Sequence, residues 1–223
     1  MTLISADQLH RLSPTCRAQD LAPALDRACR KHEINTDRRL RHFLAQVAHE
    51  SLGFTHLVEN LNYTSAERIR AVWPRRFPTV ESARPFVRNP RALANKVYGG
   101  RLGNKGPDDG WNYRGRGLIG NTGKDNYVLA SSHVGLNLVE EPGLLAADEV
   151  AALAAAGFWS ANGLNAVADV DAGEIVTQTM AEHLARNETD DLLEVTQGVN
   201  GGRIGFEDRR AWLARTAAIW SGR

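Results

Sequence analysis

Two acidic residues, Glu50 and Glu59, are the first candidates for chemistry in this chain. Glu50 follows Leu40, Phe43 and Val47, whose spacing predicts a helix with one buried face. At about 100° per residue, Glu50 lies close to the azimuth of Phe43, at the edge of the apolar stripe. Burial disfavours the charged form of a carboxyl group, so we expect a raised pKa for Glu50, which suits a general acid.

Glu59 comes after Gly53, where we expect the helix to end in a left-handed residue. The surrounding segment, residues 58–63, is rich in Asn, so we expect a hydrated carboxylate. Two carboxyl groups in unlike surroundings are the arrangement with which proteins divide acid and base roles in glycosidic bond cleavage. Most helical Glu residues are solvated or paired structurally, however, so the spacing alone leaves a structural role open.

Four motifs closely resemble, in chain order, those of family 19 glycoside hydrolases, and above all the phage and bacterial endolysin branch of that chitinase-like family. They are Ala48-His49-Glu50-Ser51, Glu59-Asn60-Leu61-Asn62-Tyr63, Tyr113-Arg114-Gly115-Arg116-Gly117-Leu118-Ile119 and Asn200-Gly201-Gly202. The resemblance covers the chain from about residue 35 to the end. It implies Glu50 as the acid, Glu59 as the base and an inverting outcome.

The resemblance also implies further site residues. Thr122 matches the position at which Ser or Thr holds the nucleophilic water, although on its own it reads as a helix N-cap. Arg203 resembles the basic residue that orients the acid. By residue type alone, Arg203, Asn126 and Asn200 fit turn or surface roles equally well. The substrate-binding residues implied are His49, Tyr63, Tyr113, Arg116, Asn126, Asn200 and Arg203. The chain departs from the family at Gly120-Asn121, where many relatives have Gln and an aliphatic residue.

Metal, serine-nucleophile and phosphate-binding chemistry are not indicated. His49 lacks the HExxH spacing, and Ser51 is not in a GxSxG elbow. The glycine-rich stretch 99–117 matches neither GxxxxGK[ST] nor GxGxxG. We therefore expect no metal and no cofactor, and we interpret His49 as a core or orienting residue. Cys16 and Cys29 are expected to be ordinary free thiols.

Composition favours a single compact domain, and the glycan partner is implied by the resemblance alone. At 24.5 kDa and 43% hydrophobic residues, the chain can bury a core as a single catalytic domain, 1–223, with a helical segment 1–34 packed on a 35–223 core. A net charge of +1 gives no reason to expect nucleic-acid binding. The basic pairs and triplets, such as Arg209-Arg210, are interpreted as solvated helix faces. No apolar run is long enough for a membrane span.

The N-terminus lacks a signal-peptide pattern. We therefore expect synthesis in the cytoplasm and action on the cell wall after release to the periplasm, for which the endolysin resemblance implies a holin or similar system. We expect a monomer.

Local signals predict a mainly α chain with a small β-hairpin near Trp111 and Tyr113. The resemblance implies a lysozyme-like (α+β) fold with two helical lobes around a substrate cleft. Helix starts are expected at capping signals: Ser5 with Gln8, Asn35 or Thr36, Thr64 with Glu67, Asn89-Pro90, Thr122, and Asp171 with Glu174. An Ala-rich helix is expected from about Asp148 to Asn162. The last helix places Trp212, Leu213, Thr216 and Trp220 at helical spacing, which predicts core tryptophans.

The resemblance implies cleavage of β-1,4 bonds in a polymer of N-acetylated amino sugars. Peptidoglycan is the preferred substrate, because the compact form and short N-terminus are similar to phage-type endolysins. Two alternatives stay open. One is a chitinase, and the other is a glycan-binding relative that no longer hydrolyses, which is supported by the departure from the family pattern at Gly120-Asn121. A toxin delivered between bacteria would keep the same chemistry.

Overall fold

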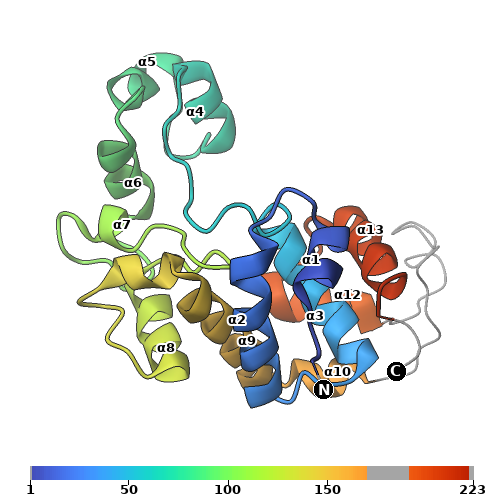
Figure 1. The fold of residues 1–223 in the computed structure, drawn as a ribbon. Helices are drawn as coiled ribbons and strands as arrows, with labels where there is room; N and C mark the ends of the chain where they lie inside the picture. The colour runs from blue at the N-terminus through green and yellow to red at the C-terminus, as the bar shows by residue number, and fades with distance from the viewer. Residues whose placement is uncertain (1, 170–190, 221–223) are drawn as a thin grey trace. The chain divides into compact units, whose positions relative to one another are not determined.

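The structure is a computed structural model that describes residues 2–169 and 191–220, and the described residues are mainly α-helical (Figure 1). Contacts divide the chain into two compact units. Unit 1 comprises residues 1–57, 117–119 and 147–223, and unit 2 comprises residues 58–116 and 120–146. The single-domain boundary and the cleft that we expect stay predictions. The helix expected at Asp171 and Glu174 lies outside the described residues.

Unit 1 contains seven described helices. They are α1 (Ala6–Leu12), α2 (Ala18–Lys31), α3 (Asp37–Glu50), α9 (Asp148–Ala161), α10 (Leu164–Ala168), α12 (Asp191–Asn200) and α13 (Phe206–Ala217). Helix α2 packs along α9, and α3 packs along α13 (Figure 1). Segments far apart in the sequence therefore build this core.

Helix α3 is the centre of that core. The hydroxyl of Thr36 caps its first turn by accepting from Arg39 N at 3.2 Å, as one of the two predicted capping residues. Leu40, Phe43 and Val47 are buried on the predicted face, and the Phe43 ring packs edge-on against Trp159 of α9 with ring centres 5.6 Å apart. The apolar spacing thus predicted the correct face of the helix.

The end of α3 has three left-handed residues, where the sequence predicts only Gly53. Leu52, Gly53 and Phe54 all have left-handed backbone angles, with φ of 49°, 71° and 64°. The Gly53 N–H donates to Ala48 O at 2.7 Å and the Leu52 N–H to His49 O at 3.3 Å, the two bonds of a Schellman ending. Gly53 is left-handed as predicted, but Leu52 already ends the helix one residue earlier.

Residues near both ends of the described chain form hydrogen bonds within unit 1. Asp26 of α2 accepts from the backbone N–H groups of Leu3 and Ile4 at 2.6 and 3.0 Å. The Trp220 ring is fully buried, and its Nε1 donates to Leu3 O at 3.0 Å. The prediction that this tryptophan belongs to the core is confirmed.

Unit 2 contains shorter helices and 3-10 turns. They are α4 (Ala66–Val72), α5 (Val80–Ala83), η1 (Arg84–Phe86), α6 (Pro90–Tyr98), α7 (Asp109–Asn112), α8 (Lys124–Val134) and η2 (Pro142–Ala146). Leu61, Ile69, Phe77 and Leu93 are central to its own core. Asn89 caps α6 with Pro90 in its first turn and Gly99 at its end, as predicted.

Three expectations for unit 2 are wrong. Helix α4 is capped by Ser65 rather than Thr64, and α8 has Gly123 at its N-cap with no side-chain cap from Thr122. The expected hairpin is absent from the described residues: Trp111 lies in the short helix α7, and only two isolated bridges, Val58 with Arg116 and Arg116 with Asn121, have β pairing.

Asp26 provides a test of the N-terminal attachment by pH. Burial raises the pKa of Asp26, but hydrogen bonds from Arg30, Ile4 and Leu3 outweigh this and hold it below its ordinary value of 3.8. A carboxyl group with a lower pKa in the folded state stabilises the fold above the unfolded value and loses that effect as the pH falls. In urea titrations at several pH values, the stability advantage of the wild type over Asp26→Asn should be constant above pH 3.8 and shrink below it. A constant advantage at every pH would contradict this.

Candidate functional site

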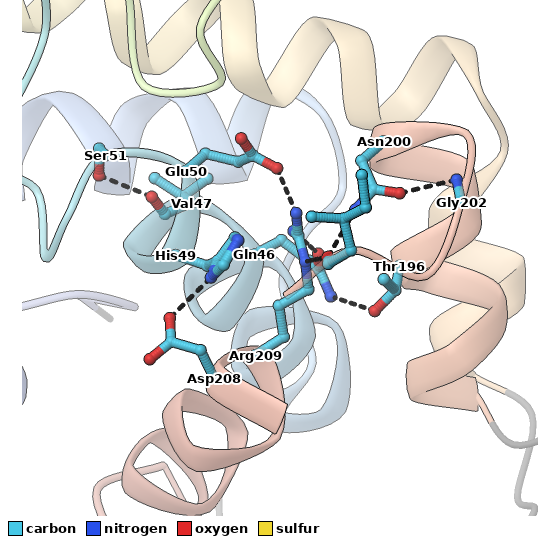
Figure 2. Close-up of polar contacts among 11 residues, drawn as sticks. Gln46, Val47, His49, Glu50, Ser51, Thr196, Asn200, Gly202, Asp208 and Arg209 are labelled. Atoms are coloured by element: carbon cyan, nitrogen blue, oxygen red, sulfur yellow. Dashed lines mark hydrogen bonds and ion pairs between the residues drawn. The ribbon is translucent and has the colours of Figure 1, made fainter. Parts of the chain in front are cut away.

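Glu50 is the last residue of α3, and its carboxyl group is half-buried against α13 of unit 1 (Figure 2). Arg209 of α13 donates from Nη2 to Glu50 Oε1 and from Nη1 to Gln46 Oε1. Its Nε donates to Ile204 O at 3.3 Å. The Arg209 side chain is only 2% exposed, so its charge is neutralised inside the protein by Glu50.

This pair changes the interpretation of Glu50. The apolar spacing of α3 predicts burial of Glu50, and burial alone disfavours a charged carboxyl group. The structure adds the Arg209 guanidinium in direct contact with the Glu50 carboxyl group. Glu50 is therefore held in a fixed position by a cation rather than merely placed against apolar side chains.

A second pair lies directly beside the first. His49 Nδ1 and Asp208 Oδ2 are 2.6 Å apart, so the neighbours of Glu50 and Arg209 also pair between α3 and α13 (Figure 2). The His49 ring packs on Gly205, where an added Cβ would lie 2.3 Å from the ring. The expectation that His49 is an orienting residue agrees with this contact, and its role in substrate binding stays a prediction.

Asn200 and Arg203 follow in the loop before α13. Asn200 Oδ1 accepts from Gly202 N at 2.7 Å and its Nδ2 donates to Ile204 O at 2.9 Å, so its side chain holds the predicted turn (Figure 2). Arg203 is exposed, and the contact with Glu50 that we expected of it is made by Arg209. Arg209 had been interpreted as part of a solvated face, which is wrong.

Glu59 belongs to unit 2, in the segment between α3 and α4, as predicted. Its side chain is half-buried rather than fully hydrated. The Tyr98 hydroxyl donates to Glu59 Oε1 at 2.6 Å, and Gly115 N donates to Oε2 at 3.3 Å. Burial, and then the negative charge of Glu59, raise the pKa of Tyr98 far above its ordinary value, so this phenol stays a donor.

Thr122 lies close to Glu59, with Gly115 between them. A Cβ on Gly115 would meet Glu59 Oε2 at 3.2 Å and Thr122 Oγ1 at 3.3 Å. The Thr122 hydroxyl donates to Gly120 O at 2.9 Å, which leaves its oxygen able to accept another hydrogen bond. A carboxylate and a hydroxyl on either side of a glycine are suited to hold a water molecule.

The other predicted residues of unit 2 mostly support this segment. Asn126 Nδ2 donates to Thr122 O at 2.7 Å, and Arg116 Nη1 donates to Tyr127 Oη at 2.8 Å. Tyr113 is buried and its hydroxyl donates to Val139 O at 3.1 Å. The half-buried Tyr63 has a pKa raised by burial and by the charge of Glu59. Substrate contacts by these four residues stay predictions.

An arginine and a tryptophan stack near Glu59. The Arg114 guanidinium lies over the Trp111 ring, 3.7 Å from its centre, and Nη1 donates to Trp111 O at 2.9 Å. Burial, with the positive charge of Arg116, lowers the pKa of Arg114. The sequence analysis did not single out this pair.

The described residues offer little for other chemistries. Among them, no group of three or more His, Cys, Asp or Glu side chains could hold a metal ion. None of the described helices has the length and apolar character that a membrane crossing demands. Cys16 is half-buried and Cys29 is buried, and both are free thiols, as predicted.

No family model matches the chain. It is similar to a glycosyl hydrolase family 19 domain-containing protein of Haemophilus influenzae, with 34% identity over 170 residues that cover 75% of this chain and 72% of that protein.

Two solved structures have a similar fold. One is chitinase C from Streptomyces griseus, at a TM-score of 0.57 and 18% identity, covering 98% of this chain and 93% of that one. The other is a bacterial family 19 chitinase, at a TM-score of 0.57 and 19% identity, covering 99% and 96% of the two chains. At these identities the likeness concerns the fold alone.

The buried pair predicts a large stability effect. Arg209→Met removes the cation and leaves the Glu50 carboxylate and the Gln46 oxygen without their donor, so we expect a loss of about 3 kcal/mol in the free energy of unfolding. Arg203→Met, a control in an exposed residue, should change it by less than about 0.5 kcal/mol. Urea denaturation measures both.

A double variant separates the ion pair from simple packing. Adding Glu50→Gln to Arg209→Met removes the unpaired charge and should restore part of the loss, because the two substitutions are coupled. Strictly additive losses would show that Arg209 acts by packing alone.

Proposed function

The chain belongs to glycosyl hydrolase family 19, and on that premise we propose that it cleaves β-1,4 bonds in a polymer of N-acetylated amino sugars by inverting acid/base catalysis. The observation that carries the proposal is the contrast between its two carboxyl groups. Glu50 is held by a buried guanidinium, whereas Glu59 is held by a phenol and a backbone amide, with the Thr122 hydroxyl close by. Unlike partners are what distinct acid and base roles require.

In the proposed mechanism, Glu59 is the general base. It takes a proton from a water molecule that the Thr122 hydroxyl also holds, and the missing side chain of Gly115 leaves room beside both oxygens. Tyr98 fixes the carboxylate through its other oxygen. Attack by this water on the anomeric carbon inverts its configuration.

Glu50 is the proposed general acid. In the protonated form that reacts, it gives its proton to the glycosidic oxygen of the leaving sugar, and the Arg209 guanidinium stabilises the carboxylate that remains. Protein carboxyl groups and water supply every proton in this scheme, so it requires no metal or cofactor.

We prefer peptidoglycan as the substrate, with an endolysin-type role. The preference rests on the resemblance of the motifs to the endolysin branch, which also implies release to the periplasm by a holin-type system. Chitin is the alternative, because two proteins of similar fold are chitinases. Both polymers share the linkage and the N-acetyl group.

A glycan-binding protein without activity is the second candidate function. It is favoured by Gly120-Asn121, where Gly120 has a φ of 63° and the buried Asn121 Nδ2 has no hydrogen-bond partner among the described residues. The retained Glu50 and Glu59, each with its own partners, argue against it.

Substitution of the two carboxyl groups tests the proposal. Glu50→Gln and Glu59→Gln should each lower hydrolysis by at least about 100-fold, because each removes a proton transfer. The assay incubates wild type and variants with purified peptidoglycan and with chitin oligomers, and mass spectrometry with reducing-end analysis identifies the bond cut. Products from neither polymer, or undiminished activity in both variants, would contradict the proposal.

Tyr98→Phe tests the environment of the proposed base. It removes the hydrogen bond that holds Glu59 Oε1, so the carboxylate loses its fixed position and the maximal rate should fall. Ser132→Ala is the control, since it removes a hydroxyl that donates to Leu129 O within α8 and is not among the predicted site residues. Equal effects of the two substitutions would exclude a specific role for Tyr98.

A further inference from the structure

A surface pocket of about 540 Å³ lies at the end of α4, within unit 2. The described residues that line it are Val72, Trp73, Pro74, Arg75, Arg76 and Arg101. Three of these six are arginines and none is acidic. An apolar wall with three guanidinium groups attracts an anion carried on a larger organic molecule.

The three arginines of the pocket are accessible to a ligand. All three are exposed, and no carboxylate among the described residues lies within ion-pair distance of them. Elsewhere in unit 2, Arg84 pairs with Glu81 and Arg91 with Asp108. Three exposed arginines without a carboxylate partner among the described residues therefore gather around one pocket.

The backbone holds the pocket in place. Arg76 N and Phe77 N both donate to Trp73 O, at 2.9 and 3.0 Å, and the Phe77 ring is fully buried. On the other side, Arg101 begins a tight loop in which Asn104 N donates to Arg101 O at 3.0 Å. Ordered backbone lowers the entropy that ligand binding must overcome.

The pocket shares neighbours with Glu59. The Trp73 ring packs edge-on against Tyr63 with ring centres 5.3 Å apart, and the pKa of Tyr63 responds to the charge of Glu59. The charge of Arg101 acts on Tyr98, whose hydroxyl donates to Glu59. Tyr63 and Tyr98 thus connect the pocket to the proposed base.

We propose that this pocket binds a carboxylate group on a side branch of the glycan whose sugar chain lies at Glu59. The inference rests on the proposed function and deepens it, because it assigns the enzyme to acidic glycans. Peptidoglycan carries peptide branches with carboxylates, whereas chitin carries only neutral N-acetyl groups. The planar arginine fork matches a carboxylate with two parallel hydrogen bonds.

Binding to insoluble polymers tests the inference. The parent is the full chain with Glu59→Gln, which should leave the polymers intact, and the test variant adds Arg75→Gln and Arg101→Gln. The control adds Arg11→Gln, an exposed arginine of α1 outside the pocket. Each protein is co-sedimented with purified peptidoglycan and with chitin beads, and its melting temperature is compared with that of the parent.

The test variant should bind peptidoglycan at least about tenfold more weakly than the parent, since two charge-assisted contacts are lost. It should bind chitin like the parent, and the control should match the parent on both polymers. Peptidoglycan whose carboxylates have been amidated should bind the parent as weakly as untreated peptidoglycan binds the test variant.

Several outcomes would overturn the inference. Equal binding of peptidoglycan by parent and test variant would do so, as would an equal loss on chitin. Loss of parental binding after hydrofluoric acid treatment, which removes phosphodiester-linked polymers and keeps carboxylates, would identify phosphate as the anion instead.

The experiments distinguish failure of the proposed catalytic function from failure of the pocket inference. If the wild type cleaves neither polymer, the catalytic proposal fails, while the binding comparison still decides the role of the pocket. If cleavage is found and binding does not depend on the arginines, only the pocket inference fails.

Discussion

The contact between Arg209 and Glu50 is the constraint on which unit 1 depends. A buried guanidinium without a counter-charge costs several kcal/mol, so α13 must place Arg209 within reach of a carboxylate. Glu50 at the end of α3 supplies the charge, and Gln46, one turn earlier, accepts a further hydrogen bond. This fixes the first turn of α13 against the last turn of α3. The contact of His49 with Asp208 and the close packing on Gly205 are consistent with that register.

Unit 2 holds its carboxylate by different means. Glu59 is on an irregular segment, so its position depends on single hydrogen bonds to Tyr98 and Gly115 rather than on helix packing. A side chain at position 115 would lie 3.2 Å from Glu59 Oε2 and 3.3 Å from Thr122 Oγ1, so one of these neighbours would have to shift to admit it. A buried cation fixes one carboxyl group, and neutral donors fix the other. The same acidic residue type thereby acquires two chemical characters.

Local signals predicted much of the fold, because helix ends depend on nearby residues. Ser5 with Gln8, Thr36 and Asn89-Pro90 all cap helices as predicted. Thr64 failed because the adjacent Ser65 has the same capping chemistry, and sequence alone does not choose between them. The strand propensity of Trp111 favoured a hairpin, but Trp111 lies in the short helix α7, where its backbone N–H donates to Asn95 Oδ1. This contact forms only in the folded chain.

The candidate-site residues that belong to sequence motifs could be predicted. Those that reach the site only through tertiary contacts could not. Glu50, Glu59 and Thr122 came from the resemblance to a family. Arg209 was missed because a pair of arginines was assumed to be solvated, although its spacing to Leu213, Thr216 and Trp220 places it on the buried face of α13. Tyr98 left no local signal, since its partner lies 39 residues away. Glu50 and Arg209 are 159 positions apart in the sequence, which affects when their contact can form during biosynthesis. Residue 209 must leave the ribosome before the buried guanidinium can meet its carboxylate, so this contact cannot form on a nascent chain that ends before α13.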